Sequence, residues 1–258
     1  MIANYHTHTV LCRHAKGDIH EYVDTAIQNG LKILGFSDHV ACDLSAYGHH
    51  SRYRMEVSEI PQYISMVQSV RKEYAGQIRI LLGYECEYYP LVFRQVLDRI
   101  TEYECDYLIL GQHFTFNEFD GVWSNAPTED PAVLRQYVDQ VIEAMGTGKF
   151  SYVAHPDLIH YVGPDHDLYL GEMSRLCRAA RELDVPLEIN CLGLSEGRQY
   201  PRADFWELVA QEGCRVILGS DAHRPEAVGN PEIIARAMDF AAGLGLTPIE
   251  TLDLRPVK

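Results

Sequence analysis

Histidine and acidic residues recur in this 258-residue chain at spacings that suit metal binding. His6-Thr7-His8 places two imidazoles two positions apart near the start of the chain, and Asp221-Ala222-His223 repeats that spacing near its end. Two side chains so spaced can face one ion where a strand gives way to a loop. Imidazole and carboxylate groups both bind transition metals. Together with single residues between these motifs, the candidate ligands are His6, His8, His14, His39, Glu85, His113, His155, Asp221 and His223.

The number of candidate ligands exceeds what one ion needs. A single ion takes about four ligands, so this set predicts two or three divalent ions, which would be Zn, Fe or Mn. Each residue also has a purely structural interpretation, since an isolated H-x-H is more often surface or core and a loop histidine such as His14 is commonly solvated. That interpretation would have to hold at every position at once, so the metal centre is favoured.

Short apolar runs alternate along the chain with amphipathic helical stretches. The runs lack strict polar alternation, as expected for strands buried on both faces. The predicted strands are Ile2–His6, Lys32–Ser37, Gln77–Glu85, Asp106–Gln112, Ser151–His155, Leu187–Asn190 and Arg215–Asp221. The predicted helices are Ile19–Asn29, Glu56–Tyr74, Pro90–Tyr103, Pro131–Met145, Leu168–Leu183, Pro201–Glu212 and Pro225–Leu244.

This alternation predicts an α/β fold with a parallel sheet and right-handed crossovers. Seven repeats favour a closed or nearly closed barrel, with a doubly wound open sheet as the alternative. No linker or low-complexity segment divides the sequence, so residues 1–258 are interpreted as one domain. In a parallel barrel the carboxyl ends of all strands lie on one rim, where active sites are built. We therefore expect the candidate ligands to meet there.

The composition limits the partners. A formal net charge of −15, with no run of lysine and arginine, argues against nucleic acid. The N-terminus has no signal-peptide pattern, and no apolar stretch is long enough to span a bilayer. Seven scattered cysteines without a C-x-x-C favour a reducing cytoplasm over a disulfide framework. We expect a cytoplasmic enzyme with a small substrate, and the sequence predicts no oligomeric state.

A set of motifs follows in order along the chain: His6-Thr7-His8, His14, Ser37-Asp38-His39, Gly83-Tyr84-Glu85, Gln112-His113-Phe114, Ala154-His155-Pro156 and Gly219-Ser220-Asp221-Ala222-His223. Together these motifs resemble the PHP (polymerase and histidinol phosphatase) family, and within it the histidinol-phosphate phosphatases. Two further segments favour that branch, namely 188–194 followed by Arg198 and Tyr200-Pro201, and Arg52 with Arg54 before Met55.

The resemblance implies a distorted (βα)7 barrel with up to three ions at its C-terminal rim. It assigns His6, His8, Glu85 and Asp221 to a first ion. Glu85 would bridge to a second ion, which His113 and His155 would also hold. A third ion would be held by His14, His39 and His223.

The implied reaction is hydrolysis of L-histidinol phosphate to L-histidinol and phosphate in histidine biosynthesis. A hydroxide shared by two ions would attack phosphorus. Arg198 or Arg54 would grip the phosphate through a planar fork. Arg52 and Asn190 complete the candidate substrate-binding set. Asp221 and His223 are the candidates for proton handling at the leaving alcohol.

Several alternatives stay open at this point. The segment 114–131 is shorter than in many members of the family and can shape the substrate pocket differently, so another phosphate ester or phosphotyrosine is an alternative substrate. Amidohydrolases also begin with H-x-H on the first strand of a barrel, but they usually take single histidines from strands five and six and an Asp from the last strand. Here strand six ends in Asn190, and His39, Glu85 and the pairing of Asp221 with His223 are additional to that pattern. A nuclease is disfavoured by the acidic charge, and a non-catalytic metal-binding protein would need saturated coordination.

Overall fold

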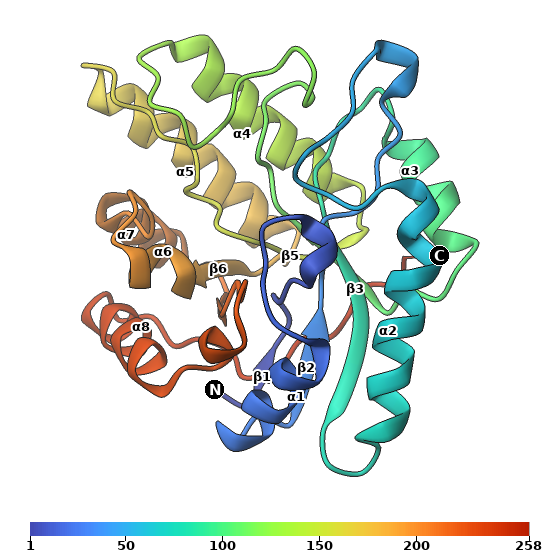
Figure 1. Ribbon diagram of the computed structural model, residues 1–258. Coiled ribbons are helices and arrows are strands. Elements are labelled where there is room, and N and C mark those ends of the chain that lie inside the picture. Colours follow the sequence, from blue (N-terminus) through green and yellow to red (C-terminus); the bar gives the residue numbers. More distant parts are fainter. Residues whose placement is uncertain (258) are drawn as a thin grey trace.

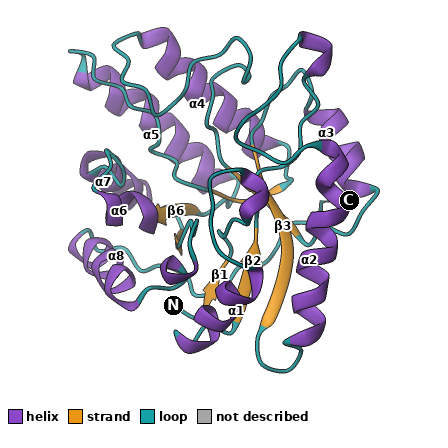
Figure 2. Cartoon of the chain, in the orientation of Figure 1, coloured by secondary structure: helices purple, strands orange, loops and turns teal. Residues whose placement is uncertain are grey.

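The computed structural model describes residues 1–257, and a single seven-stranded sheet runs through them. Every strand pairs in parallel with the next one along the chain, so the spatial order is the sequence order. Figure 2 shows the strands at the centre of the molecule, with the helices around them. The seven predicted strands are all present, mostly shorter than expected. They are β1 (Ala3–Asn4), β2 (Ile33–Phe36), β3 (Arg79–Cys86), β4 (Tyr107–Leu110), β5 (Phe150–Val153), β6 (Leu187–Asn190) and β7 (Val216–Gly219).

The sheet curls into a nearly closed barrel, because the first and last strands meet just beyond their ends. Thr7 and Ala222 form a parallel bridge, in which the His8 amide donates to the Ala222 carbonyl at 2.9 Å. A doubly wound sheet would place β1 in its middle, so the sequential order shows that alternative to be wrong. The seam between β5 and β6 is pinned at a single register pair, Val153 with Leu187, which distorts the ring.

Helices cover the outside of the barrel (Figure 1). Six of the predicted helices are found with ends that shift by a few residues, and the seventh, predicted over Pro225–Leu244, is divided. They are α1 (Ile19–Gln28), α2 (Ile60–Glu73), α3 (Phe93–Thr101), α4 (Pro131–Gly146), α5 (His166–Glu182), α7 (Ala203–Glu212) and α8 (Pro231–Gly243), joined by the short α6 (Cys191–Glu196) and the 3-10 turns η1 (Val10–Cys12), η2 (Ser45–Tyr47), η3 (Val57–Glu59) and η4 (Pro225–Ala227).

Two differences from the sequence prediction concern the end of the barrel where the site lies. The unpredicted helix α6 starts directly at the end of β6, with the Asn190 side chain capping its first turn. The stretch predicted as one helix over Pro225–Leu244 is η4 followed by α8, because Gly229 adopts a left-handed φ of 57° and Asn230 caps a new helix.

Apolar side chains fill the barrel in two layers, one inside the ring and one between the ring and the helices. Along β3 the residues alternate, with Leu81 inside and Leu82 outside. Tyr107 fills much of the interior and donates a hydrogen bond to the Tyr5 carbonyl at 2.7 Å. It needs a glycine beside it, because a Cβ at position 83 would lie 2.4 Å from its ring. The interior is therefore a packed plug, and the inward positions just above it are free for polar groups.

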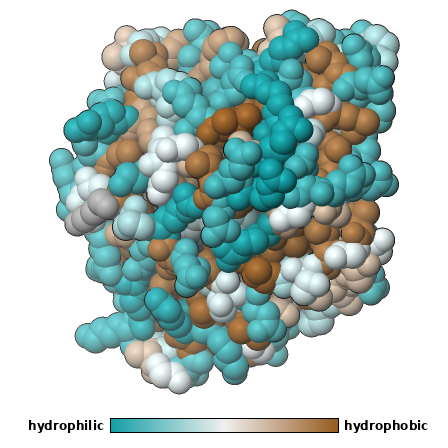
Figure 3. Space-filling view, turned by 180° about the vertical axis from the view of Figure 1, so that it is seen from behind, coloured by the Kyte–Doolittle hydropathy of each residue, from teal (hydrophilic) through white to brown (hydrophobic). Residues whose placement is uncertain are grey.

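Figure 3 shows the face of the molecule opposite to the one seen in Figure 1. Hydrophilic side chains cover much of this face, with apolar side chains between them. In residues 1–257 no helix combines the length and apolar character that a membrane span requires.

Candidate metal centre

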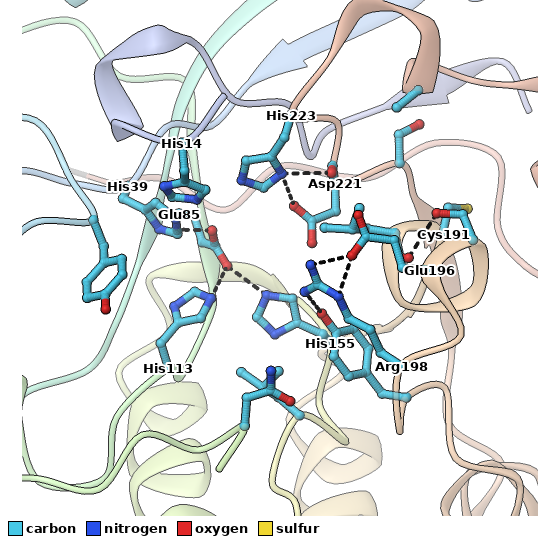
Figure 4. A pocket seen from close by; sticks show the side chains of 18 of the residues that line it. His14, His39, Glu85, His113, His155, Cys191, Glu196, Arg198, Asp221 and His223 are labelled. Atoms are coloured by element: carbon cyan, nitrogen blue, oxygen red, sulfur yellow. Dashed lines mark hydrogen bonds and ion pairs between the residues drawn. The ribbon is translucent and has the colours of Figure 1, made fainter. Parts of the chain in front are cut away.

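All of the candidate ligands lie at the carboxyl ends of the strands or in the loops that follow them. Seven of them line the floor of one cavity (Figure 4), namely His14, His39, Glu85, His113, His155, Asp221 and His223. His6 and His8 are buried at the same floor, in contact with Glu85 and Asp221. His6 and His8 follow β1, His39 follows β2, Glu85 is in β3, His113 follows β4, and His155 follows β5. Asp221 and His223 follow β7, and His14 comes from the loop after η1. Residues more than two hundred positions apart are thereby brought within contact of one another.

Glu85 stands at the centre of this floor, and its two carboxylate oxygens face different partners. Oε2 lies 3.4 Å from Nε2 of His6, 3.4 Å from Nε2 of His8 and 3.1 Å from Nδ1 of His39. Oε1 lies 2.9 Å from Nε2 of His155 and 3.5 Å from Nε2 of His113. A carboxylate placed in this way has the geometry needed to bridge two cations.

His6, His8, Glu85 and Asp221 bring two imidazole nitrogens close to two carboxylate oxygens. The two imidazole Nε2 atoms each lie 3.4 Å from Oε2 of Glu85, and they lie 3.4 and 3.3 Å from Oδ1 of Asp221. A tetrahedral ion with ligand bonds of about 2.0–2.1 Å separates its ligands by roughly 3.3–3.4 Å. These four distances therefore match the spacing between ligands of one such ion.

A third group of imidazoles gathers beside the first. The His14 and His223 rings stack at 4.6 Å, and the His8 and His223 rings at 4.1 Å. His14 donates from Nδ1 to the Cys12 carbonyl at 2.7 Å, and His223 from Nδ1 to the Asp221 carbonyl at 3.1 Å. These bonds fix the tautomer of both rings and leave each Nε2 with a lone pair, which is the form that binds metal.

Several buried ring nitrogens in this floor have no hydrogen-bond partner among residues 1–257. They include Nε2 of His6, Nδ1 of His39 and Nε2 of His223. An unpaired buried polar atom costs on the order of 1–3 kcal/mol. Several such atoms facing one another beside two carboxylates are explained by cations between them, so the donor set and its geometry fit a cluster of divalent ions.

The backbone is shaped to deliver two of these side chains. His155 and Asp221 adopt left-handed φ angles of 31° and 48°, a region that non-glycine residues rarely occupy. Space is also made for the acidic groups, since a Cβ at Gly111 would lie 1.9 Å from Oε1 of Glu85, and one at Gly219 would lie 2.1 Å from Oε2 of Glu188. Strained backbone conformations and glycines that make room for neighbouring groups are both found at functional sites.

A second layer of acidic residues orients the histidines, and the sequence interpretation missed it as a group. The Glu188 carboxylate accepts from Nδ1 of His6 at 2.9 Å, and the Glu87 carboxylate accepts from Nδ1 of His113 at 2.9 Å. Both bonds turn Nε2 toward the cluster. The available signal was strand periodicity, because Glu87 lies two positions beyond Glu85 and therefore on the same side.

The charges of the floor suit cations. Burial disfavours ionisation of Glu85, but His113 and His39 hold the pKa of its carboxyl well below 4.5. Burial is likewise overcome at Asp221, whose pKa is held well below 3.8 by His6 and His8. Burial lowers the pKa of His39 well below 6.5, so this ring is neutral at pH 7. Burial by itself lowers the pKa of His6, but the carboxylates of Asp221 and Glu188 outweigh it and raise this pKa well above 6.5. A metal ion that binds His6 must therefore displace a proton.

The four residues expected to bind substrate lie in different surroundings. Arg198 lines the cavity and contacts Glu196 and the Tyr200 hydroxyl, the latter at 2.8 Å. Asn190 is buried beneath the floor, where its amide donates to Glu188 at 2.7 Å and to Asp221 at 3.1 Å. Arg52 is exposed and does not line the cavity.

Arg54 borders the cavity but is almost fully buried, with 2% of its side chain exposed. Its guanidinium donates to Glu87 at 2.7 Å and to Glu118 at 2.6 Å. Its nitrogens are thus occupied by protein carboxylates and the Val40 carbonyl at 3.2 Å. The structure places Arg54 behind the metal floor, where it neutralises the acid that orients His113.

The cavity above the floor measures about 770 Å³, enough for a small organic ligand. The sequence interpretation did not single out Arg224, which lines this cavity next to His223. The guanidinium of Arg224 makes no hydrogen bond or ion pair with any residue in 1–257. Its position directly after the Asp221-Ala222-His223 motif was the signal that could have identified it.

Comparisons with known proteins agree with this arrangement. The model of the PHP domain family matches residues 4–191. A Deinococcus radiodurans protein named "Probable histidinol-phosphatase" is 29% identical over 88% of this chain and 88% of its own length, and the Bacillus subtilis "Histidinol-phosphatase" is 24% identical over 87% and 94%. A Lactococcus lactis histidinol phosphate phosphatase, solved with zinc, L-histidinol and phosphate, superposes with a TM-score of 0.74 at 18% identity, over 97% of this chain and 96% of its own.

Proposed function

The chain belongs to the PHP domain family, and from this membership and the geometry of the site we propose that it is a metal-dependent phosphatase that hydrolyses L-histidinol phosphate. The observation that carries the proposal is the placement of Glu85, whose two oxygens face two separate sets of histidines. Phosphate ester hydrolysis is the chemistry for which clusters of adjacent divalent ions are typically used.

The residues fit three ion positions. His6, His8, Glu85 and Asp221 would hold the first ion, since the distances between their imidazole nitrogens and carboxylate oxygens suit ligands of one ion. Glu85, His113 and His155 would hold the second, and His14, His39 and His223 the third. When bound, such ions would lower the pKa of a coordinated water and neutralise charge on the phosphoryl oxygens. Zinc, iron and manganese all suit these donors.

The chain's own residues would then bind and orient the ester. Arg198 follows α6 and Arg224 follows β7, and both line the cavity, where each can donate to phosphate oxygens. His6, His8 and Glu85 on the floor are almost fully buried, and such a low-dielectric environment strengthens electrostatic interactions at the reacting group. Asp221 and His223 are adjacent at 3.3 Å and are candidates for passing a proton to the leaving alkoxide.

Three features separate this proposal from its alternatives. The relatives named as histidinol-phosphatases match nearly their whole length, which favours that ester over phosphotyrosine or another phosphate monoester. An amidohydrolase would not need the acidic layer and the third histidine group. A storage or structural metal site would not need a cavity of about 770 Å³ opening directly onto its ligands.

We also infer that residues 1–258 act as one phosphoesterase domain, since ligands come from both ends of the chain, His6 and His223. A small phosphorylated substrate and a cytoplasmic location accord with this role, and the acidic net charge of −15 disfavours nucleic acid as a partner.

The test couples elemental analysis of the purified protein to phosphate release from L-histidinol phosphate. We expect two or three divalent ions per chain and turnover that chelation abolishes and metal restores. A parallel assay for ammonia release tests the amidohydrolase alternative. Full phosphatase activity after chelation and dialysis, or ammonia release without phosphate release, would overturn the proposal.

A further inference from the structure

Three aromatic side chains line the cavity next to the metal floor, and the proposed reaction does not use them. Tyr53, Phe114 and Trp123 border the same cavity as His113 and His39. The Trp123 ring stacks on His113 at 5.9 Å, and Tyr53 lies 5.6 Å from Trp123. Tyr53 is 47% exposed. We call Tyr53, Phe114 and Trp123 the aromatic wall.

The aromatic wall is rigid because a tight hairpin carries most of it. Phe114 and Trp123 form an antiparallel bridge, and the Ser124 amide donates to the His113 carbonyl at 2.7 Å. The two arms of the hairpin approach closely at Gly121, where an added Cβ would lie 1.8 Å from the Thr115 carbonyl oxygen. Phe114 also meets Trp123 edge-to-face at 4.8 Å, which fixes the indole plane.

A buried ion pair joins the loop carrying Tyr53 to this hairpin. Arg54, the next residue after Tyr53, donates to the buried Glu118 of the hairpin at 2.6 Å. The same two segments also stack Tyr47 on Phe119 at 4.7 Å with an interplanar angle of 7°. Arg54 further reaches Glu87, the partner of His113. The aromatic wall is therefore held in a fixed relation to the metal floor.

We propose that the aromatic wall binds the leaving alcohol of the substrate and selects phosphate monoesters whose alcohol carries a flat, ring-shaped group. This inference rests on the proposed function, because the ions would hold the phosphate on the floor and leave the alcohol to face the cavity. A ring attached a few bonds from phosphorus then reaches the wall next to His113. Contact with aromatic faces favours a planar group over an aliphatic one, and more so if the group is cationic.

The short hairpin brings Trp123 back beside His113. The exposed part of Tyr53 and the half-buried Trp123 are the surfaces that a ring of the substrate would cover. Phe116, on the same hairpin but 54% exposed and outside the cavity, offers a matched control.

The kinetic test compares two esters that differ only in the ring. L-Histidinol phosphate carries an imidazolylmethyl group, and phosphoethanolamine is the same amino-alcohol phosphate without it. We expect the wild-type protein to prefer the ring-bearing ester in kcat/KM, and Trp123→Leu or Tyr53→Leu to reduce this preference about tenfold, mainly through KM. Phe116→Leu should leave the preference unchanged. An unchanged preference in both wall variants, or an equal loss with Phe116→Leu, would overturn the inference.

A binding test needs no turnover, so it separates failure of the proposed phosphatase function from failure of the aromatic wall to bind the ring. The chain has two tryptophans, and the other one, Trp206, is fully buried. L-Histidinol added to the metal-loaded protein should change the fluorescence of Trp123, whereas ethanolamine should not. The signal should disappear in Trp123→Leu. If no phosphate ester is hydrolysed but the signal is present, the proposed function fails, and only the binding of the ring by the aromatic wall is supported. If esters are hydrolysed but histidinol produces no signal, the inference about the wall fails.

Discussion

The floor of the cavity and its mouth differ in burial, in origin and in how their polar groups are paired. On the floor, His6, His8 and Glu85 are at most 1% exposed, and each comes from a strand or the residues directly after one. At the mouth, Tyr53 is 47% exposed and Arg224 has a guanidinium with no partner in residues 1–257. On the floor, the distances from Nε2 of His6 and His8 to the Glu85 and Asp221 carboxylates already match the separation between ligands of one ion. At the mouth, polar and aromatic side chains face the cavity instead of one another.

The difference shows how one fold separates chemistry from specificity. Strand ends are fixed by the hydrogen bonds of the ladder and by the packed interior beneath them, so they place ligands reproducibly. Loops carry the residues that meet the variable part of a substrate. We therefore expect changes on the floor to affect every substrate and the metal content, and changes at the mouth to affect one class of substrate. The following experiments test that separation.

The largest effect is expected from Glu85→Gln on the floor. The amide keeps the shape of the side chain but removes the charge shared between two sets of histidines. Turnover of all phosphate esters should fall by about a thousandfold or more, with loss of bound metal measured by elemental analysis. Glu129→Gln, at an exposed loop position, is the control. Near-normal metal content and activity in Glu85→Gln would contradict the role of this residue.

Glu188→Gln tests the layer beneath the floor. The glutamate accepts from Nδ1 of His6, and an amide can present either a donor or an acceptor to that nitrogen. Metal affinity should fall roughly 10–100-fold, as measured by competition with a chelator. Excess metal should restore most of the turnover, because no ligand atom has been removed. A variant that excess metal fails to rescue would indicate that Glu188 acts in another way.

Arg54→Met tests whether this arginine belongs to the floor or to the mouth. Its removal leaves Glu87 and Glu118 buried without their cation, so the protein should lose on the order of 3–5 kcal/mol of stability in denaturant unfolding. Arg52→Met, on the exposed side of the same loop, should change stability by less than about 0.5 kcal/mol. An unchanged stability together with a raised KM would instead show that Arg54 grips the phosphate.

Arg198→Ala and Arg224→Ala test the phosphate grip at the mouth. Each removes a cation that lines the cavity without contacting the proposed ions. We expect KM for phosphate esters to rise about tenfold, with metal content unchanged. Arg198 is partly engaged by Glu196, so Arg224→Ala should have the larger effect. Loss of metal in either variant would break the distinction between floor and mouth.

The smallest effect concerns pH and the metal-free protein. Burial opposes the charged form of His6, but the carboxylates of Asp221 and Glu188 raise its pKa well above 6.5. A raised pKa gives stability that is fully present below about pH 6.5 and is lost as pH rises through the folded-state value. Metal binding strengthens over the same range, because it displaces that proton. The thermal midpoint of the metal-free protein should fall by a few degrees above pH 6.5, while its gap to the loaded protein widens.

Much of this protein was accessible from the sequence. The apolar runs predicted all seven strands, because a strand that is buried on both faces has a nearly continuous hydrophobic sequence. The candidate ligands followed from their positions at the ends of those runs, and the family resemblance added their grouping. The predicted helix boundaries were less accurate around Asn190 and Gly229. Asn190 caps the short helix α6, and the left-handed Gly229 is followed by Asn230, which caps α8.

Tertiary structure alone decided which polar residues support the site and which face the substrate. Arg54 and Arg224 have the same chemistry in the sequence, yet one is buried between two carboxylates and the other is open to the cavity. Trp123 lies beside His113 only because a hairpin returns it there. Residue types and strand periodicity determine what can bind a metal and on which rim, since both are local properties. The pairing of charges and the lining of a cavity depend on contacts between distant segments, which only the folded chain creates.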